Sequence, residues 1–125
     1  MAGLTLDAGA LIAFERNDRR VVAMIARTLE HGYSLAVPAG VVGQVWRDGR
    51  QQVRLARLLG AGDVEIEALD DTRARHAGQL CGLRNTVDVI DASVVLCARA
   101  RGHRIATSDT EDLRRLDASV PLIRV

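Results

Sequence analysis

Short apolar segments alternate with longer amphipathic segments along the chain, and this alternation restricts the fold more than any other feature. Segments of strand length are predicted at residues 3–6, 34–37, 64–68, 103–107 and 121–125. Helical spacing of apolar residues, with capping residues and glycines at the ends, predicts helices at residues 10–15, 19–31, 40–47, 51–59, 72–83, 87–101 and 111–116. Strands that alternate with helices in this way predict a three-layer α/β/α sandwich with a mostly parallel five-stranded sheet. Residues 64–68 alternate apolar with acidic side chains, which predicts a strand at the edge of that sheet.

The composition fits one cytoplasmic domain. The chain has 125 residues, of which 48% are hydrophobic, so we expect residues 1–125 to form a single domain with its own core. Cys81 and Cys97 stand among apolar neighbours and are expected to be buried, reduced thiols. No apolar stretch reaches the roughly 20 residues that span a bilayer, and the first residues lack the basic segment of a signal peptide. These features predict a cytoplasmic protein without a membrane partner.

Two aspartates follow predicted strands. Asp7 comes directly after the first strand, and Asp109 comes two residues after the end of the fourth. The carboxyl ends of parallel strands meet at one edge of a sheet, which is where such folds bind ligands, so both side chains are expected over that edge. A second interpretation is open for each residue, because an aspartate after a strand commonly caps the next helix.

Asp91 lies within an unusually apolar predicted helix. On a helix that starts near Val87, the same sector contains Val87, Val94, Val95 and Ala98, and Asp91 in the second turn is too deep for an N-cap. A buried carboxylate is costly unless it is paired, hydrogen-bonded or bound to a metal. An ion pair with a buried arginine remains open, but we favour a functional role.

Asp88 and Asp112 are weaker candidates. Thr86 is expected to cap the helix that contains Asp91, which places Asp88 in the first turn and on the same face. There Asp88 either stabilises the helix dipole or widens an acidic pocket. The same two roles are open for Asp112, three residues after Asp109, but we expect it to face solvent.

Convergence of Asp7, Asp91 and Asp109 would place three negative charges close together. Such charges raise one another's pKa and destabilise the fold unless a cation neutralises them. Carboxylate oxygens as the only ligands favour Mg²⁺ or Mn²⁺. A hard cation held by carboxylates, with open positions for water, is suited to phosphodiester hydrolysis.

Four segments resemble, in their order and spacing, the motifs of PIN domains, and within that family the short VapC-type toxins. They are LDAGALIAF, VPAGVVGQVWR, DVIDASVVLCARARG and TSDTEDL, and the resemblance covers essentially the whole chain. It implies the strand order 3-2-1-4-5 and a Mg²⁺-dependent (or Mn²⁺-dependent) endoribonuclease that cleaves RNA. It also implies a VapB-type antitoxin partner and a homodimer. Asp7, Asp91 and Asp109 stand at the acidic positions of these motifs.

One position departs from the family pattern. The second motif of the family has a glutamate where this chain has Gln44. Glutamine keeps an oxygen ligand but lacks the charge, so a weaker metal affinity is expected unless Asp88 compensates. The alternative function is therefore a PIN-fold module that binds RNA or an antitoxin without efficient turnover.

The distribution of charge allows RNA binding without requiring it. The net charge is +1, from 17 basic and 16 acidic residues, and every basic residue is arginine. Arginines that follow the second and fourth motifs either contact RNA phosphates or lie on solvated helix surface: Arg47, Arg50, Arg114 and Arg115. A phospho-acceptor receiver domain is a further α/β alternative, but it needs a lysine near its acceptor aspartate, and the chain has none.

Overall fold

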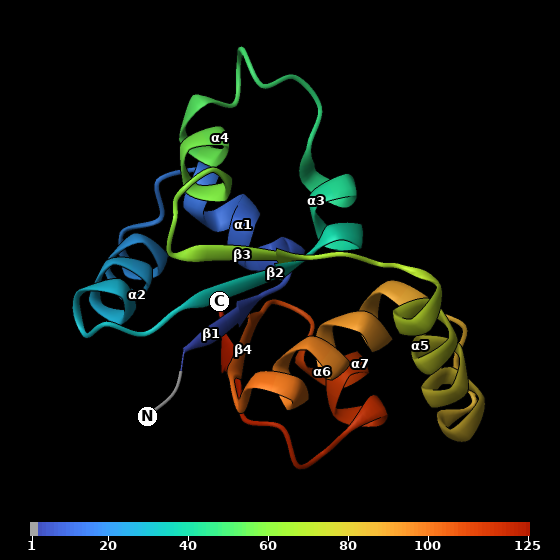
Figure 1. Ribbon diagram of the computed structural model, residues 1–125. Coiled ribbons are helices and arrows are strands. Elements are labelled where there is room, and N and C mark those ends of the chain that lie inside the picture. Colours follow the sequence, from blue (N-terminus) through green and yellow to red (C-terminus); the bar gives the residue numbers. More distant parts are fainter. Residues whose placement is uncertain (1–2) are drawn as a thin grey trace.

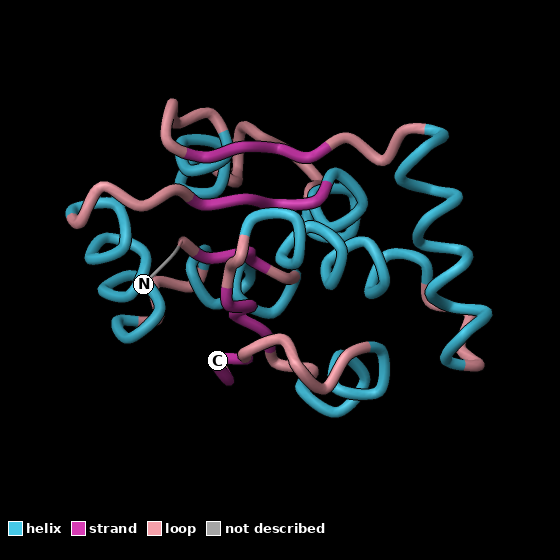
Figure 2. Tube along the Cα trace, turned by 60° about the horizontal axis from the view of Figure 1, so that its bottom comes forward, coloured by secondary structure: helices cyan, strands magenta, loops and turns pink. Residues whose placement is uncertain are grey.

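The computed structural model describes residues 3–125 and has one five-stranded sheet in which neighbouring strands are parallel. The strands are β1 (Leu4–Leu6), β2 (Leu35–Pro38), β3 (Val64–Glu67), β4 (Arg104–Thr107) and β5 (Leu122–Arg124). Their order is β3-β2-β1-β4-β5, as the resemblance implies. The strands run side by side in the middle of the molecule, with helices around them (Figure 2).

Two groups of helices cover the sheet. The helices are α1 (Ala8–Glu15), α2 (Arg19–Glu30), α3 (Ala39–Val45), α4 (Val53–Leu59), α5 (Asp71–Arg84), α6 (Val89–Arg101) and α7 (Thr110–Leu116). One face is covered by α1, α2 and α4, and the other by α6, against which α5 and α7 pack (Figure 1). The predicted three-layer α/β/α sandwich is therefore confirmed. The short helix α3 follows β2 and packs against both α1 and α6, at the edge where the strands end.

The core lies where α1 and α6 pack on opposite faces of β1 and β4. All three residues of β1 are buried. The buried residues of α6 are Ala92, Ser93, Val94, Val95, Cys97 and Ala98. A helix that is apolar on nearly all sides is stable only inside a protein, so its packing fixes α6 over the centre of the sheet. Each large apolar side chain buried here contributes roughly 1.5–3 kcal/mol.

The edge position of β3 is also confirmed. Its two glutamates, Glu65 and Glu67, form ion pairs with Arg101 of α6, and Glu67 also pairs with Arg73 of α5 at 2.8 Å. Charged side chains at an edge strand discourage pairing with a foreign strand. The same ion pairs connect the edge of the sheet to the two helices that cover it.

One helix boundary differs from the prediction and changes the place of Asp91. Helix α5 ends at Asn85, which has the left-handed φ of 53°, and Asp88 instead of Thr86 is the N-cap of α6. The Asp88 carboxylate accepts a hydrogen bond from the N–H of Asp91 at 2.9 Å, and aspartate is the stronger N-cap residue. Val87, predicted inside the helix, precedes it and is 93% exposed. Asp91 therefore lies in the first turn of α6, not the second.

Both cysteines are buried and unpaired, as predicted. Burial raises the pKa of the Cys97 thiol to about 11, so this thiol is protonated at neutral pH. Within residues 3–125, the helices are too short or too polar to cross a bilayer.

Candidate metal centre

The strand order places the candidate residues at the point where the chain changes direction across the sheet. From β1 the chain continues through β2 to β3 on one side, and from β4 it continues to β5 on the other. Parallel sheets bind ligands beyond the carboxyl ends of the two strands that flank such a point. Asp7 follows β1 directly, and Asp109 follows β4 after one intervening residue, Ser108. The predicted position of both aspartates at one edge of the sheet is confirmed.

Asp7 is buried and held by two hydrogen bonds. Asp7 is only 5% exposed, and its Oδ1 accepts a hydrogen bond from the N–H of Ala8 at 2.8 Å. This bond caps α1, so the capping role is real. Its Oδ2 accepts from the hydroxyl of Thr107, the last residue of β4, at 2.8 Å. Asp7 is thus both a helix cap and a fixed negative charge beside β4.

Thr107 connects the two strand ends through one hydroxyl group. The hydroxyl donates to Asp7, and its oxygen accepts from the N–H of Asp109 at 2.9 Å. The residue is fully buried, so its geometry is set by the sheet. Thr107 therefore orients the carboxylate after β1 and the backbone that carries the carboxylate after β4. This role of Thr107 is not apparent from the sequence alone.

Asp91 approaches the same edge from the first turn of α6 and is partly buried. Burial and the negative charges of Asp88, Asp7, Asp109 and Asp112 raise its pKa to about 7. Among the ion pairs of residues 3–125, none involves Asp91, so the arginine partner left open by the sequence is not found there. Helix dipole and capping bonds alone do not offset this concentration of like charge.

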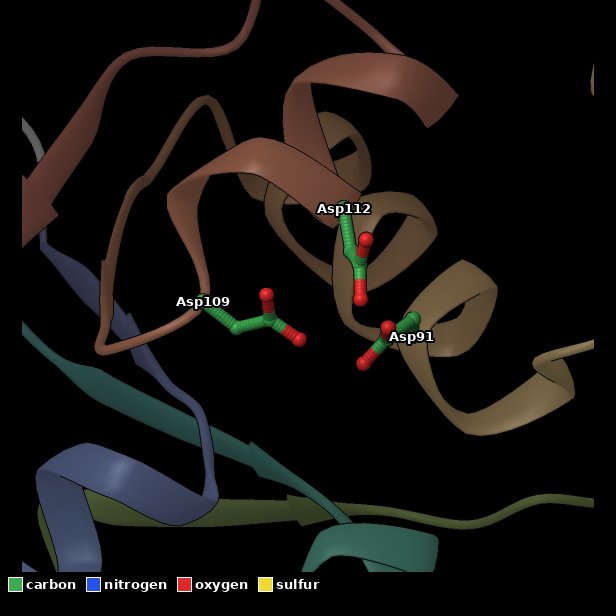
Figure 3. Close-up of side chains that lie close together, drawn as sticks. All are labelled: Asp91, Asp109 and Asp112. Atoms are coloured by element: carbon green, nitrogen blue, oxygen red, sulfur yellow. The ribbon is translucent and has the colours of Figure 1, made fainter.

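Asp91, Asp109 and Asp112 point toward one another (Figure 3). One carboxylate oxygen from each lies within 4.8 Å of the others, a separation that one metal ion can bridge. Burial, the charge of Asp112 and a hydrogen bond between the two side chains raise the pKa of Asp109. Asp109 occupies the N-cap position of α7 without capping it, so the alternative helix-capping role is not used.

Asp112 is exposed, as predicted, and it also belongs to the acidic group at this edge of the sheet. Its side chain is 52% exposed, yet it completes the three-carboxylate group and contacts Arg115 at 3.8 Å. The signal in the sequence was the spacing of Asp109 and Asp112 at the start of a short helix, where the first turn brings both side chains to one side. Nothing in that spacing revealed that Asp91 would lie opposite them.

The other two candidates lie at the margin of the group. Asp88 is exposed and accepts the N–H of Asp91, and its charge is the largest electrostatic contribution to the raised pKa of Asp91. Gln44 is exposed in the last turn of α3, one turn after Gly40. A side chain at Gly40 would meet Ile90 of α6 at 3.1 Å, so α3 lies close to the start of α6. Gln44 is on the helix that borders the site, without a hydrogen bond among the described residues.

The donor set fits a hard divalent cation. It consists of carboxylate oxygens only. The negative charges of these aspartates raise the pKa of Asp91 and of Asp109. Within the described chain, no arginine forms an ion pair with Asp91 that would offset its charge. Mg²⁺ and Mn²⁺ prefer such ligands and keep several waters. Asp7 lies near enough for its charge to raise the pKa of both Asp91 and Asp109, but both its oxygens already accept hydrogen bonds. Its role as a direct metal ligand stays a prediction.

The four arginines that follow the second and fourth motifs differ in their contacts with the rest of the chain. Arg47 donates to two carbonyl groups at the end of α3, and Arg50 forms an ion pair with Asp48. Arg115 contacts Asp112, whereas Arg114 is exposed and has no ion pair among residues 3–125. Contact of these arginines with RNA stays a prediction.

Comparisons with known proteins identify the fold. No family model matches the sequence, and the search of curated proteins gave no significant match. Among solved structures, FitAcB from Neisseria gonorrhoeae is 18% identical with a TM-score of 0.64, over 97% of this chain and 96% of that one. VapBC2 from Rickettsia felis, bound to a DNA fragment from its promoter, is 13% identical with a TM-score of 0.69, over 98% of both chains.

A third solved structure is a toxin that cleaves the sarcin-ricin loop, VapC20 of Mycobacterium tuberculosis. It is 16% identical to this chain, with a TM-score of 0.67 over 98% of this chain and 100% of that one. Strand order, carboxylates at the switch point and these structural matches agree. The chain therefore has the PIN fold of VapC-type toxins, as its motifs predict.

Proposed function

We propose that the protein is a metal-dependent endoribonuclease and the toxin of a VapBC-type toxin–antitoxin pair. The observation that carries the proposal is the group formed by Asp91, Asp109 and Asp112 at the switch point of a PIN fold. Such a group has no structural purpose in itself, because its charges repel one another. RNA as the substrate is supported by the similarity to a toxin that cleaves the sarcin-ricin loop.

Asp91, Asp109 and Asp112 would hold Mg²⁺ or Mn²⁺, with Asp7 beside them. A bound divalent cation polarises a phosphoryl oxygen and lowers the pKa of a coordinated water. Because the pKa of Asp91 is raised to about 7, its carboxyl group is partly protonated near neutral pH in the metal-free protein. Binding of the cation would displace that proton from Asp91. Thr107 keeps Asp7 and the backbone of Asp109 in place during these changes.

Asp88 and Gln44 have supporting roles in this proposal. Asp88 fixes the first turn of α6 through the N–H of Asp91, and its charge strengthens the attraction for a cation. Gln44 would contact the hydrated cation or the RNA backbone through its amide group. These roles make Asp7, Gln44, Asp88, Asp91 and Asp109 the proposed catalytic set, with Asp112 added.

The proposed partners follow from the structural matches. FitAcB and VapBC2 are assemblies, and VapBC2 is bound to promoter DNA. We therefore propose a VapB-type antitoxin that silences this chain, and a single domain, residues 1–125, that acts in the cytoplasm. Leu83 and Val87 at the α5–α6 connection are 81% and 93% exposed, and such apolar side chains suit a homodimer contact. A Val87→Glu variant that elutes as a smaller species than the wild type would support this contact.

Cleavage of structured RNAs by the wild type and by Asp91→Asn tests the enzyme. Each protein is assayed with Mg²⁺, with Mn²⁺ and with EDTA. Asp63→Asn serves as the matched control, because Asp63 is exposed and lies at the amino end of β3, away from the carboxyl ends of the strands. The proposal predicts cleavage by the wild type and Asp63→Asn, only with metal, and none by Asp91→Asn. Equal cleavage by Asp91→Asn would contradict it.

Gln44 favours the second candidate function, a module that binds RNA or antitoxin without turnover. Here the family glutamate is replaced by an uncharged side chain on the helix that borders the site. If the folded wild type binds RNA but does not cleave it, Gln44→Glu is the deciding variant. Recovery of metal-dependent cleavage in Gln44→Glu would show that this one substitution accounts for the loss.

A further inference from the structure

A cavity of about 590 Å³ lies on the opposite side of the fold from the carboxylates. One side of α2 forms its wall, and the connection to β2, the first residue of β4 and the middle of β5 close it. Figure 1 shows α2 at the left of the sheet, while the strands run toward α3 and α5 on the right. The volume is within the roughly 300–1,000 Å³ range of small-molecule sites. We call this cavity the α2 pocket.

Three guanidinium groups line the α2 pocket without an acidic counterpart. They belong to Arg20 and Arg27 of α2 and to Arg104 of β4, and no aspartate or glutamate is among the lining residues. None of the three forms an ion pair within residues 3–125. Arginine stays protonated at any physiological pH, so the pocket has a fixed positive charge.

Two of the pocket arginines differ in their hydrogen bonding: Arg20 is held by a carbonyl group, whereas Arg104 has a buried N–H without a partner in the described part of the chain. The Nη2 of Arg20 donates to the carbonyl of Arg124 at 3.0 Å, which anchors its guanidinium group beside β5. The Nε of Arg104 is buried and has no hydrogen-bond partner in the described part of the chain. A buried N–H without an acceptor costs free energy. An anion with several oxygens suits a cavity lined by three arginines.

Apart from Thr28 and His31, the rest of the lining is apolar or aromatic. Ala23, Met24 and Ile123 form an apolar wall, and the ring of Tyr33 stands beside it. A simple anion site needs no such wall, whereas a ligand that joins a phosphate to a flat ring uses both surfaces. An acidic peptide would satisfy the arginines but would leave this wall without a contact.

We propose that the α2 pocket binds a nucleoside phosphate, with the phosphate on the three arginines and the base against Tyr33 and the apolar wall. The ligand is either a free mononucleotide or the phosphorylated end of an RNA strand. The pocket contains no carboxylate that could hold a metal, so this is a binding site and not a second place of cleavage. The inference stands apart from the proposed nuclease activity.

Calorimetric titrations of the full chain in EDTA test the pocket while metal-dependent turnover is prevented. The probes are AMP, adenosine, inorganic phosphate, a tetraglutamate peptide, and one RNA oligonucleotide with and without a 5′-phosphate. We expect AMP to bind more tightly than adenosine or phosphate alone. A preference for the 5′-phosphorylated oligonucleotide over AMP would assign the ligand to an RNA end, and equal or weaker binding would assign it to a free nucleotide.

Arg27→Gln is the main variant, since Arg27 is exposed on α2 and the fold does not depend on its side chain. It is expected to weaken AMP binding about tenfold or more, because one charge-assisted contact is lost. Arg104→Gln should have a similar effect, with the fold of each variant checked by circular dichroism. Arg57→Gln is the matched control, because Arg57 is an exposed arginine of α4 outside the pocket.

Several outcomes would overturn the proposal. They are the absence of AMP binding, AMP binding that is unchanged in Arg27→Gln, and tetraglutamate binding at least as tight as that of AMP. Asp91→Asn should bind AMP like the wild type, since Asp91 lies at the other edge of the sheet. RNA cleavage without nucleotide binding would reject the pocket and leave the nuclease proposal intact.

Discussion

The charged regions at the two ends of α6 differ in how their charge is neutralised. At its start, Asp91 meets Asp109 and Asp112, and no arginine offsets the charge of Asp91 within the described chain. At its end, Arg101 is enclosed by Glu65 and Glu67 of the edge strand. The central residue of each region, Asp91 or Arg101, is partly buried. The first leaves its charge to be neutralised by a ligand, and the second neutralises its charge within the fold.

This difference separates a binding site from a structural element. Glu67 is contacted by Arg101 and Arg73, with side chains that are 12%, 19% and 21% exposed, so its charge is matched in place. Removal of one partner should then destabilise the fold. Removal of one carboxylate from the metal centre should have the opposite effect on the metal-free fold and abolish activity instead.

The largest expected effect is on RNA cleavage by Asp109→Asn and Asp112→Asn. Each variant removes one oxygen ligand with its charge, and cleavage should fall by about a hundredfold to a thousandfold. The initial rate of RNA cleavage with Mn²⁺ measures it, with Asp63→Asn as the control. Wild-type rates in Asp112→Asn would show that this exposed residue is only a neighbour of the site.

The next largest effect is on stability, in the region of the paired charges. Glu67→Gln leaves Arg101 and Arg73 without their shared carboxylate and should lower the free energy of unfolding by about 3 kcal/mol. Denaturation in urea measures this change. Asp71→Asn is the control, because its pair with Arg75 is exposed and is expected to contribute less than about 0.5 kcal/mol. Equal losses of stability in the two variants would mean that the buried ion pairs of Glu67 contribute no more than an exposed pair.

A smaller effect is expected at Thr107, which supports the metal centre without belonging to it. Thr107→Val removes the hydroxyl that donates to Asp7 and accepts from Asp109, and should weaken Mn²⁺ binding about tenfold. Thr107→Ser keeps the hydroxyl and should restore most of the affinity. Calorimetric titration with Mn²⁺ measures both. Similar losses in the valine and serine variants would indicate that packing, not the hydroxyl, matters here.

The smallest expected effect concerns the pH dependence of stability through Asp91. Its pKa is raised from 3.8 to about 7 in the folded protein, so between these values the folded chain holds a proton that the unfolded chain has released. The free energy of unfolding without metal should therefore decrease as the pH rises through this range and level off above it. Asp91→Asn lacks this decrease. The free energy of unfolding of the variant minus that of the wild type should therefore increase by about 1 kcal/mol from pH 5 to pH 8. This figure is reduced for the partial solvent exposure of Asp91.

Urea denaturation at both pH values, in EDTA, measures this difference. Added Mn²⁺ should reverse its sign at pH 8, because only the wild type gains the stabilisation that comes from metal binding. A stability gap between the two proteins that is the same at both pH values would mean that the carboxyl group of Asp91 does not titrate in this range.

Much of the fold was predictable because its signals are local. Gly102 ends α6 with a φ of 65°, and the alternating acids of β3 marked an edge strand. The start of α6 was not predictable, because Thr86 and Asp88 are both good N-cap residues and the sequence does not say which one begins the helix. The consequence is local but relevant, since it moves Asp91 into the first turn of α6.

The sequence by itself determined the alternation of strands and helices, and with it the placement of Asp7 and Asp109 at the carboxyl edge of the sheet. These features depend on hydrophobic periodicity and on chain direction, which neighbouring residues encode. Only the tertiary structure decided that Asp112 faces Asp91, that Thr107 joins Asp7 to Asp109, and that arginines of α2 and β4 share one cavity. Such contacts join segments far apart in the chain, and their geometry is set by how helices pack on the sheet.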